Sequence, residues 1–249
     1  MTLIDSIKTR RSIRRYSDKE VTDSLLNELL DLSARTQTMG NLQLYSVVVT
    51  RDKEMKQKLA PAHFNQPMVT GAPVMLTICA DWNRTTRWCQ ERNAQPGYDN
   101  LLSFLNAASD ALLYAQTFCN LAEERGLGVC YLGTTLYNPD AIIDTLKLPR
   151  LVMPIATLTV GWPDEQPALN DRLPLASFLH KETYRDYSVK DINLYYNLKE
   201  SLIENQEFVR INKKENLAQV YTDCRYTSTD NEAISKTLLA ALCRQGFLD

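Results

Sequence analysis

Runs of apolar residues divide this chain into short strands and longer helices. Residues 44–50 and 74–79 are rich in β-branched side chains and are bounded by polar residues or proline, which is typical of strands buried on both faces. Residues 129–132 and 151–160 have the same character, and the second of these runs ends at Gly161. The pattern therefore predicts a strand in each of these segments.

Between the strands, apolar residues recur every three or four positions. Leucines at this spacing predict a capped helix over residues 23–35, and residues 52–60 are helical in pattern too. The longest such pattern covers residues 100–125, and its many apolar residues indicate a helix that crosses the centre of the domain. Asn138 before Pro139 is typical of a helix start with Asn138 as the N-cap.

The last third of the chain is less regular. Residues 164–180 are rich in proline and predict an irregular segment, and helical patterns follow near residues 191–206 and 230–245. In the absence of repeats we expect one domain over residues 1–249, in which residues 185–249 form a helical C-terminal extension. Strands separated by helices predict an α/β or α+β domain, and the spacing leaves the strand directions open.

The composition excludes several classes of protein. The 249 residues are 44% hydrophobic and 23% charged, which suits a globular domain with a sizeable core. The net charge is -2, so no general basic field is available for nucleic acid or for an anionic membrane. The longest apolar runs, residues 73–80 and 151–160, are far shorter than the roughly 20 residues of a membrane helix. We therefore expect no nucleic-acid partner and no membrane.

The cysteine, histidine and glycine content narrows the chemistry further. The six cysteines form no Cys-x-x-Cys pair, and free thiols fit the reducing cytoplasm, where we place the protein. The two histidines, His63 and His180, exclude a multi-histidine metal site, and we expect no metal. The Gly-x-Gly sequence at residues 126–128 has Tyr131 where a dinucleotide-binding fingerprint needs glycine. A bound phosphate must therefore be held by side chains.

Basic residues gather near the N-terminus, at Lys8, Arg10, Arg11, Arg14 and Arg15. Arg10 and Arg14 are four residues apart, so on a helical turn their guanidinium groups point the same way and suit a phosphate or another planar anion. A solvated basic face is the simpler explanation when the cluster is considered alone.

Further motifs along the chain favour an anion site over a solvated basic face. Residues 10–16 read Arg-Arg-Ser-Ile-Arg-Arg-Tyr, residues 41–43 read Asn-Leu-Gln before a strand, and residues 126–133 read Gly-Leu-Gly-Val-Cys-Tyr-Leu-Gly. Gly-Trp-Pro at residues 161–163 is followed by Arg-Leu-Pro at residues 172–174. In this order and spacing the motifs resemble the nitroreductase family of flavin enzymes, and the last is most similar to the branch of larger NADPH-dependent reductases.

The resemblance implies an α+β nitroreductase-like fold, with a central, mostly antiparallel sheet flanked by helices and a long buried central helix. It also implies a homodimer with FMN bound at two sites along the interface. The implied activity is that of an FMN-dependent oxidoreductase, which transfers hydride from NADPH or NADH through the flavin to nitroaromatics, quinones or free flavins by a ping-pong mechanism. A small-molecule electron acceptor is therefore the expected partner besides a second copy of the chain.

The resemblance also supplies candidate site residues. Those that match FMN-binding positions of the family are Arg10, Arg11, Ser12, Arg14, Gln66, Tyr131, Leu132, Gly133 and Arg172. Gln66 matches a polar contact to the edge of the isoalloxazine ring, and residues 131–133 match a stretch whose backbone lies against the flavin. Thr38 lies in a segment that is often rich in serine in the family, and it is the remaining candidate hydroxyl donor.

Physical chemistry gives the arginines distinct roles in such a site. Hydride transfer to flavin N5 leaves negative charge near N1 and O2, and a fixed guanidinium beside these atoms stabilises it, for which Arg14 is the candidate. Arg10 and Arg172 would then neutralise the phosphate. Because the flavin supplies the redox chemistry, no catalytic nucleophile or general base is expected among the side chains.

Two other functions stay open from the sequence. A flavin-binding dimer that stores, senses or delivers FMN without turnover would carry the same motifs, and the altered residues 36–40 would allow it. A plain interaction domain whose basic N-terminal cluster binds acidic partners would leave the later motifs unexplained.

Overall fold

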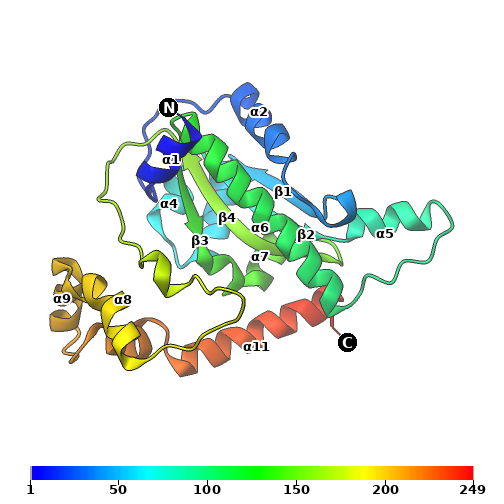
Figure 1. Cartoon of the computed structure of the whole chain (residues 1–249). Coiled ribbons are helices and arrows are strands. Elements are labelled where there is room, and N and C mark those ends of the chain that lie inside the picture. Colours follow the sequence, from blue (N-terminus) through cyan, green and yellow to red (C-terminus); the bar gives the residue numbers. More distant parts are fainter. Residues whose placement is uncertain (1, 249) are drawn as a thin grey trace. The chain divides into compact units, whose positions relative to one another are not determined.

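Four antiparallel strands form the centre of the fold in the computed structural model, which describes residues 2–248 (Figure 1). The strands are β1 (Tyr45–Thr50), β2 (Val74–Asp81), β3 (Gly128–Leu132) and β4 (Val152–Gly161). Their spatial order is β1-β2-β4-β3, and each neighbouring pair is antiparallel. The direction of the strands, which the sequence pattern left open, is therefore the one that the family resemblance implied.

The two central strands are the most apolar and the most buried. Every residue of β2 and β4 is buried, as predicted for strands covered on both faces. β1 is different, because it forms an edge of the sheet and exposes 41% of Val49. The prediction that residues 44–50 are buried on both faces is therefore wrong for β1. β3 forms the other edge, where Gly128 lies opposite Gly161 of β4.

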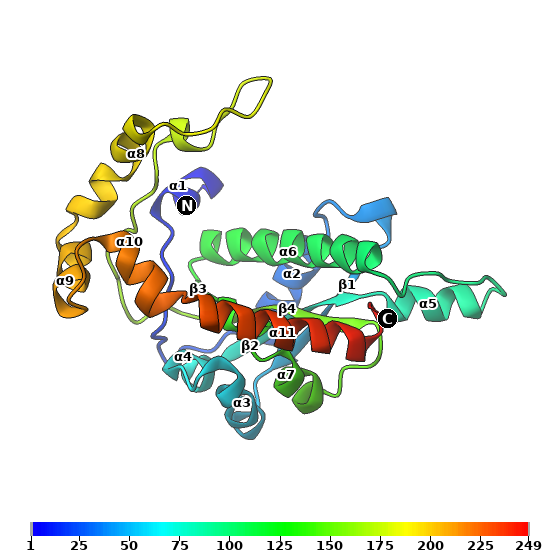
Figure 2. The same cartoon turned by 90° about the horizontal axis from the view of Figure 1, so that it is seen from below.

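Helices cover both faces of the sheet. Before and between the strands the chain forms α1 (Leu3–Thr9), α2 (Asp23–Ser33), α3 (Lys53–Leu59), α4 (Pro67–Gly71), α5 (Asn83–Gln90), α6 (Leu101–Glu124) and α7 (Pro139–Leu146). Figure 2 shows α6 on one face of the sheet and α3, α4 and α7 on the other. Asn138, predicted to cap α7, makes no capping bond, since its Nδ2 donates to the Ala62 carbonyl at 3.2 Å.

The long helix α6 is buried along one side only. Its alanines and aromatic residues, including Ala111, Tyr114 and Phe118, pack against the sheet. On its other side it exposes Leu101, Leu102, Leu105, Leu112 and Leu113 by 44 to 68%. The expected central helix is present, but within one chain it flanks the sheet and leaves a leucine-rich face uncovered.

The chain divides into two compact units, residues 1–168 together with 234–249, and residues 169–233. The second unit contains a short turn of 3-10 helix at Leu175–Ser177, followed by α8 (Val189–Ser201), α9 (Ile203–Ile211), α10 (Leu217–Val220) and the start of α11 (Ser228–Gln245). The helix predicted near residues 191–206 is interrupted, because Leu202 adopts an extended conformation between α8 and α9.

The end of α11 belongs to the first unit. Ala241, Leu242 and Phe247 are buried in the same apolar core as α6, so the C-terminal residues are part of the core of that unit. None of the helices within residues 2–248 has an apolar stretch long enough to span a bilayer.

Candidate functional site

The basic N-terminal segment lies along the edge of the sheet beside β3. The Ile13 amide donates a hydrogen bond to the Val129 carbonyl at 3.1 Å, and Ser12 pairs with the same residue in parallel orientation. Gly128 permits this approach, because a Cβ atom there would lie 2.6 Å from the Cβ of Ile13. The structure thus places the arginine motif and the 126–133 motif side by side.

The arginines of this segment differ in what they contact. Arg10 Nε lies 3.3 Å from Glu123 Oε1, and Arg11 Nε donates to the Pro167 carbonyl at 2.6 Å. Arg15 Nε lies 3.3 Å from an oxygen of Glu165. Within residues 2–248 the guanidinium of Arg14 forms no ion pair with a carboxylate. The environment of Arg14 therefore fits a role in binding an anion from outside the chain.

Arg14 lies close to Cys130 at the edge of β3. Burial raises the pKa of the Cys130 thiol, while the neighbouring charges of Arg14 and Arg10 lower it in part. With its raised pKa the thiol stays protonated at neutral pH, so it does not compensate the charge of Arg14.

Near the C-terminal end of α6, the carboxylate of Glu123 contacts Arg10. Burial raises the pKa of Glu123, and the charge of Arg10 opposes this rise. Both residues line a hollow of about 370 Å³, together with Arg11, Ser6 and Glu165. The Ser6 hydroxyl is buried there and has no hydrogen-bond partner among residues 2–248. The hollow therefore combines two arginines with two carboxylates, and its charge is largely balanced.

The turn that carries Gln66 is fixed against the end of β3. His63 Nδ1 lies 2.9 Å from Thr134 Oγ1, and the imidazole is fully buried. Burial lowers the pKa of His63 to about 4, so the ring is neutral at physiological pH. Gln66 follows three residues later, and Gly133 precedes Thr134. This contact brings two of the predicted flavin-binding segments together.

Gly133 borders open space. Apart from its neighbours along the chain, no atom of residues 2–248 would lie within 4 Å of a Cβ atom at this position, in contrast to Gly128. The nearby Tyr131 is 45% exposed, whereas the side chain of Leu132 is buried in an apolar cluster with residues of α3, α4 and α7. The backbone at Gly133 can therefore be approached by a ligand.

The structure does not bring Thr38 to this group. Thr38 lies in the segment before β1, where Asp110 of α6 accepts the amide of Met39 at 2.9 Å and the amide of Leu44 at 3.1 Å. Arg10 contacts Glu123, 13 residues farther along α6, which corresponds to about 20 Å of helix. Figure 2 shows α1 near one end of α6 and the segment before β1 farther along the same helix.

Eight of the ten predicted residues thus lie on or beside the edge of β3, and they are Arg10, Arg11, Ser12, Arg14, Gln66, Tyr131, Leu132 and Gly133. Arg172 belongs to the second unit, where it is exposed and donates to the Asp171 carbonyl at 2.8 Å. Its place at the phosphate stays a prediction.

Sequence reasoning missed several polar residues that hold these segments. Glu123, Glu165, Asp110 and His63 each contact a segment far away in the sequence. Glu165 follows Pro163 of the Gly-Trp-Pro motif by two residues, which was the one local signal available.

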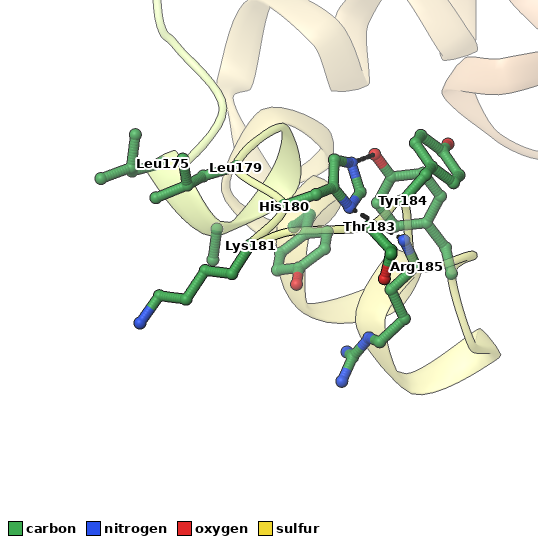
Figure 3. Close-up of a pocket in the computed structure, with 10 residues that line it drawn as sticks. Leu175, Leu179, His180, Lys181, Thr183, Tyr184 and Arg185 are labelled. Carbon is green, nitrogen blue, oxygen red and sulfur yellow. Dashed lines mark hydrogen bonds between the residues drawn. The ribbon is translucent and has the colours of Figure 1, made fainter.

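The second unit contains a separate hollow of about 760 Å³, which none of the predicted residues lines (Figure 3). Its wall is an aromatic cluster, in which the ring of His180 stacks on Tyr184 at 4.2 Å. Tyr187 donates to the Ser177 carbonyl at 2.8 Å, and His180 Nδ1 accepts the Arg185 amide at 3.3 Å. These polar atoms are satisfied by one another, so the cluster is explained by packing.

Comparison with known proteins identifies the family. Residues 7–162 match the nitroreductase family. The chain belongs to this family. Over 184 residues it is 33% identical to the FMN reductase [NAD(P)H] of Bacillus subtilis, which covers 73% of this chain and 74% of that protein. Over 192 residues it is 31% identical to the oxygen-insensitive NADPH nitroreductase of Salmonella typhimurium, and the match covers 77% of this chain and 78% of that protein.

The nitroreductase fold is also shared by solved structures. A crystal structure of a Bacteroides fragilis protein is 62% identical, covers 98% of this chain and 100% of its own, and superposes with a TM-score of 0.97. The similarity to this solved structure therefore extends over both compact units.

Proposed function

We propose that this chain is an FMN-dependent NAD(P)H oxidoreductase. It passes hydride from NADPH or NADH through FMN to a small-molecule acceptor, such as a nitroaromatic, a quinone or a free flavin, in a ping-pong sequence. The observation that carries the proposal is the environment of Arg14, whose guanidinium has no carboxylate partner within residues 2–248 and lies beside the strand that leads to Gly133. The names of the two relatives described above support the same activity.

The residues present fit FMN. The guanidinium of Arg14 is available for the electron-rich edge of the ring, and the backbone at Gly133 has room for a flat group. The hydroxyl of Thr38 is buried without a hydrogen-bond partner among residues 2–248, so it can donate to or accept from a ligand.

In this proposal the bound FMN supplies the hydride chemistry, and the chain binds and orients it. Arg14 stabilises the negative charge that develops at one edge of the ring, and Gln66 hydrogen-bonds to another edge. Gly133 allows the backbone to approach the ring, while Arg10, Arg11, Ser12 and Arg172 bind the phosphate end. The neutral His63 holds the Gln66 turn against Thr134.

We further propose that the working unit is a homodimer in the cytoplasm, where NAD(P)H is available. The leucine-rich face of α6 and the exposed Leu3, Ile4 and Ile7 of α1 are apolar surfaces suited to a second copy. The neighbour of Thr38, Met39, contacts α6 at Asp110, whereas Arg10 contacts it at Glu123, and this agrees with the proposal because a dimer allows each copy to supply Thr38 to the site of the other.

The decisive experiment is an anaerobic absorbance spectrum of the protein with FMN, before and after NADPH and then NADH are added. Bleaching of bound flavin by either donor supports the oxidoreductase, and the faster donor identifies its preference. Bound flavin that neither donor bleaches would favour storage, sensing or delivery of FMN. Protein that stays colourless after incubation with FMN would contradict both functions.

A further inference from the structure

The carboxylate of Glu165 hydrogen-bonds to the backbone of the loop that carries Arg14. Its Oε1 accepts the backbone amide of Arg14 at 2.5 Å and the amide of Arg15 at 3.0 Å. Its Oε2 lies 3.3 Å from Nε of Arg15. One side chain therefore accepts two successive amides, and the first is the amide of the arginine that the proposed function places beside the flavin.

The contact is charge-assisted. The hydrogen bond from the Arg14 amide is the largest influence on Glu165, and it holds the pKa of the carboxyl below its usual range. At neutral pH the group is therefore ionised, and hydrogen bonds to a carboxylate are about twice as strong as those between neutral groups. No local sequence pattern links the two residues, since Glu165 and Arg14 are 151 residues apart.

Other contacts fix the path of the loop but not the amide of Arg14. The Asp164 amide donates to the Arg15 carbonyl at 3.0 Å, and the Ser17 amide donates to the Trp162 carbonyl at 2.9 Å. Tyr16 donates to the Ile13 carbonyl at 2.6 Å. Loss of Glu165 would therefore leave the loop attached at both ends while its middle, at Arg14, is released.

We propose that Glu165 is a positioning residue for the flavin chemistry, which aims the guanidinium of Arg14 by fixing its backbone. The inference rests on the proposed function, in which Arg14 stabilises the reduced ring. Arg14 supplies the positive charge, and Glu165 fixes the position of that charge by accepting the backbone amide of Arg14. A guanidinium that must be reoriented during the reaction stabilises the developing charge less well than one that is fixed beforehand.

Two substitutions separate position from charge. Glu165→Gln keeps an oxygen that can accept both amides and removes the negative charge near the site. Glu165→Ala removes the charge and also the acceptor. If Glu165 acted by its charge alone, both variants would raise the flavin midpoint potential, because a nearby negative charge disfavours the reduced, anionic ring. If it positions Arg14, Glu165→Ala instead lowers the potential, and Glu165→Gln does not.

The test measures the flavin midpoint potential and the rate of anaerobic bleaching by NADPH in the FMN-loaded protein. We expect Glu165→Ala to bleach on the order of tenfold more slowly, Glu165→Gln to stay near the wild type, and the double variant with Arg14→Ala to be no slower than Arg14→Ala alone. Glu28→Ala is the matched control, because Glu28 pairs on the surface with the side chain of Arg125.

A second readout needs no flavin. Amide hydrogen exchange of residues 10–17 in the ligand-free protein should become faster in Glu165→Ala and remain slow in Glu165→Gln and Glu28→Ala. Wild-type exchange and wild-type potential in Glu165→Ala would overturn this inference while the proposed function stands. Wild-type protein that takes up no FMN would overturn the proposed function, and the inference with it.

Discussion

Arg10 and Glu123 form an ion pair at the end of α6, with Nε 3.3 Å from Oε1 and the carboxylate side chain only 9% exposed. Burial raises the pKa of Glu123, so the carboxylate is held in an environment that does not favour its charge. If Arg10 binds the phosphate of FMN, Glu123 competes with the phosphate for the same guanidinium and repels it.

The first prediction follows from this competition. Glu123→Gln should bind FMN about fivefold more tightly, roughly 1 kcal/mol, because Arg10 is released from its internal partner and one negative charge is removed. Titration of FMN fluorescence at neutral pH measures the affinity, with Glu28→Gln as the control for loss of a surface carboxylate. Weaker binding in Glu123→Gln would mean that the ion pair holds Arg10 in place for the phosphate.

The second prediction separates the roles of two arginines. Arg14→Ala should lower the flavin midpoint potential and slow bleaching by NADPH on the order of 10- to 100-fold, because a fixed charge beside the reduced ring is lost. Arg172→Ala should mainly weaken retention of FMN. Stopped-flow absorbance and dialysis measure the two effects, with Arg125→Ala as the control for loss of an exposed arginine in an ion pair. Equal losses of retention alone in both variants would contradict these roles.

Local patterns were sufficient for the elements around the site. The strands at residues 74–79 and 151–160 and the helix at 100–125 were predicted because their periods and end signals lie within a few residues of each other. The solvent exposure of each strand was harder to predict. β1 has the composition of a central strand, but it pairs with β2 only, and Val49 is exposed. The order of the strands is set by contacts between distant segments, which no local period records.

The candidate site, too, could be predicted only in part from the sequence. Motif resemblance found the arginines and residues 131–133, which the structure brings together beside β3. It could not show that, within residues 2–248, Arg10 pairs with a carboxylate and the guanidinium of Arg14 does not, because Glu123 and Glu165 contact the N-terminal segment from far along the chain. It also could not show that Met39, next to Thr38, and Arg10 contact α6 at residues about 20 Å apart along the helix, since this depends on how the helix lies between the two segments.

The third prediction uses the open space at Gly133. Gly133→Ala should leave the midpoint of thermal unfolding of the ligand-free protein almost unchanged, because a Cβ there contacts nothing within 4 Å. It should nevertheless weaken FMN binding by about tenfold, since the methyl group enters the space that we assign to the ring. Gly97→Ala, which is equally unobstructed, is the control. Unchanged FMN affinity in Gly133→Ala would place the ring elsewhere.

The fourth prediction concerns the close contact at Gly128. A methyl group there would lie 2.6 to 2.8 Å from three side-chain atoms of Ile13, so the N-terminal segment must move away from β3. Gly128→Ala should therefore cost about 1 to 3 kcal/mol of unfolding free energy and also weaken FMN binding. Urea unfolding of the ligand-free protein measures the first effect, with Gly97→Ala as the control. Wild-type stability in Gly128→Ala would show that the segment is not held against the strand.

The fifth prediction is a pH dependence that arises from His63. The ring is fully buried, contacts Thr134 Oγ1 at 2.9 Å, and has a pKa lowered by burial from 6.5 to about 4. In the unfolded chain the imidazole takes up a proton as the pH falls below about 6.5, whereas the folded protein does so only near pH 4. The contribution of His63 is therefore complete above pH 6.5 and is lost progressively between pH 6.5 and pH 4.

The size of this loss follows from the shift. Since each pKa unit corresponds to about 1.4 kcal/mol, the unfolding free energy should fall by roughly 3 kcal/mol across this window because of His63 alone. Carboxylates such as Glu165 add their own loss toward the acidic end, so the informative quantity is the difference between wild type and His63→Gln, which removes the titrating ring and can still hydrogen-bond to Thr134. Urea unfolding at several pH values between 4.5 and 7.5 should show a flatter profile of unfolding free energy for His63→Gln than for the wild type. Parallel profiles for wild type and His63→Gln would mean that the imidazole has the same pKa in the folded and the unfolded protein, and would contradict the lowering of its pKa by burial.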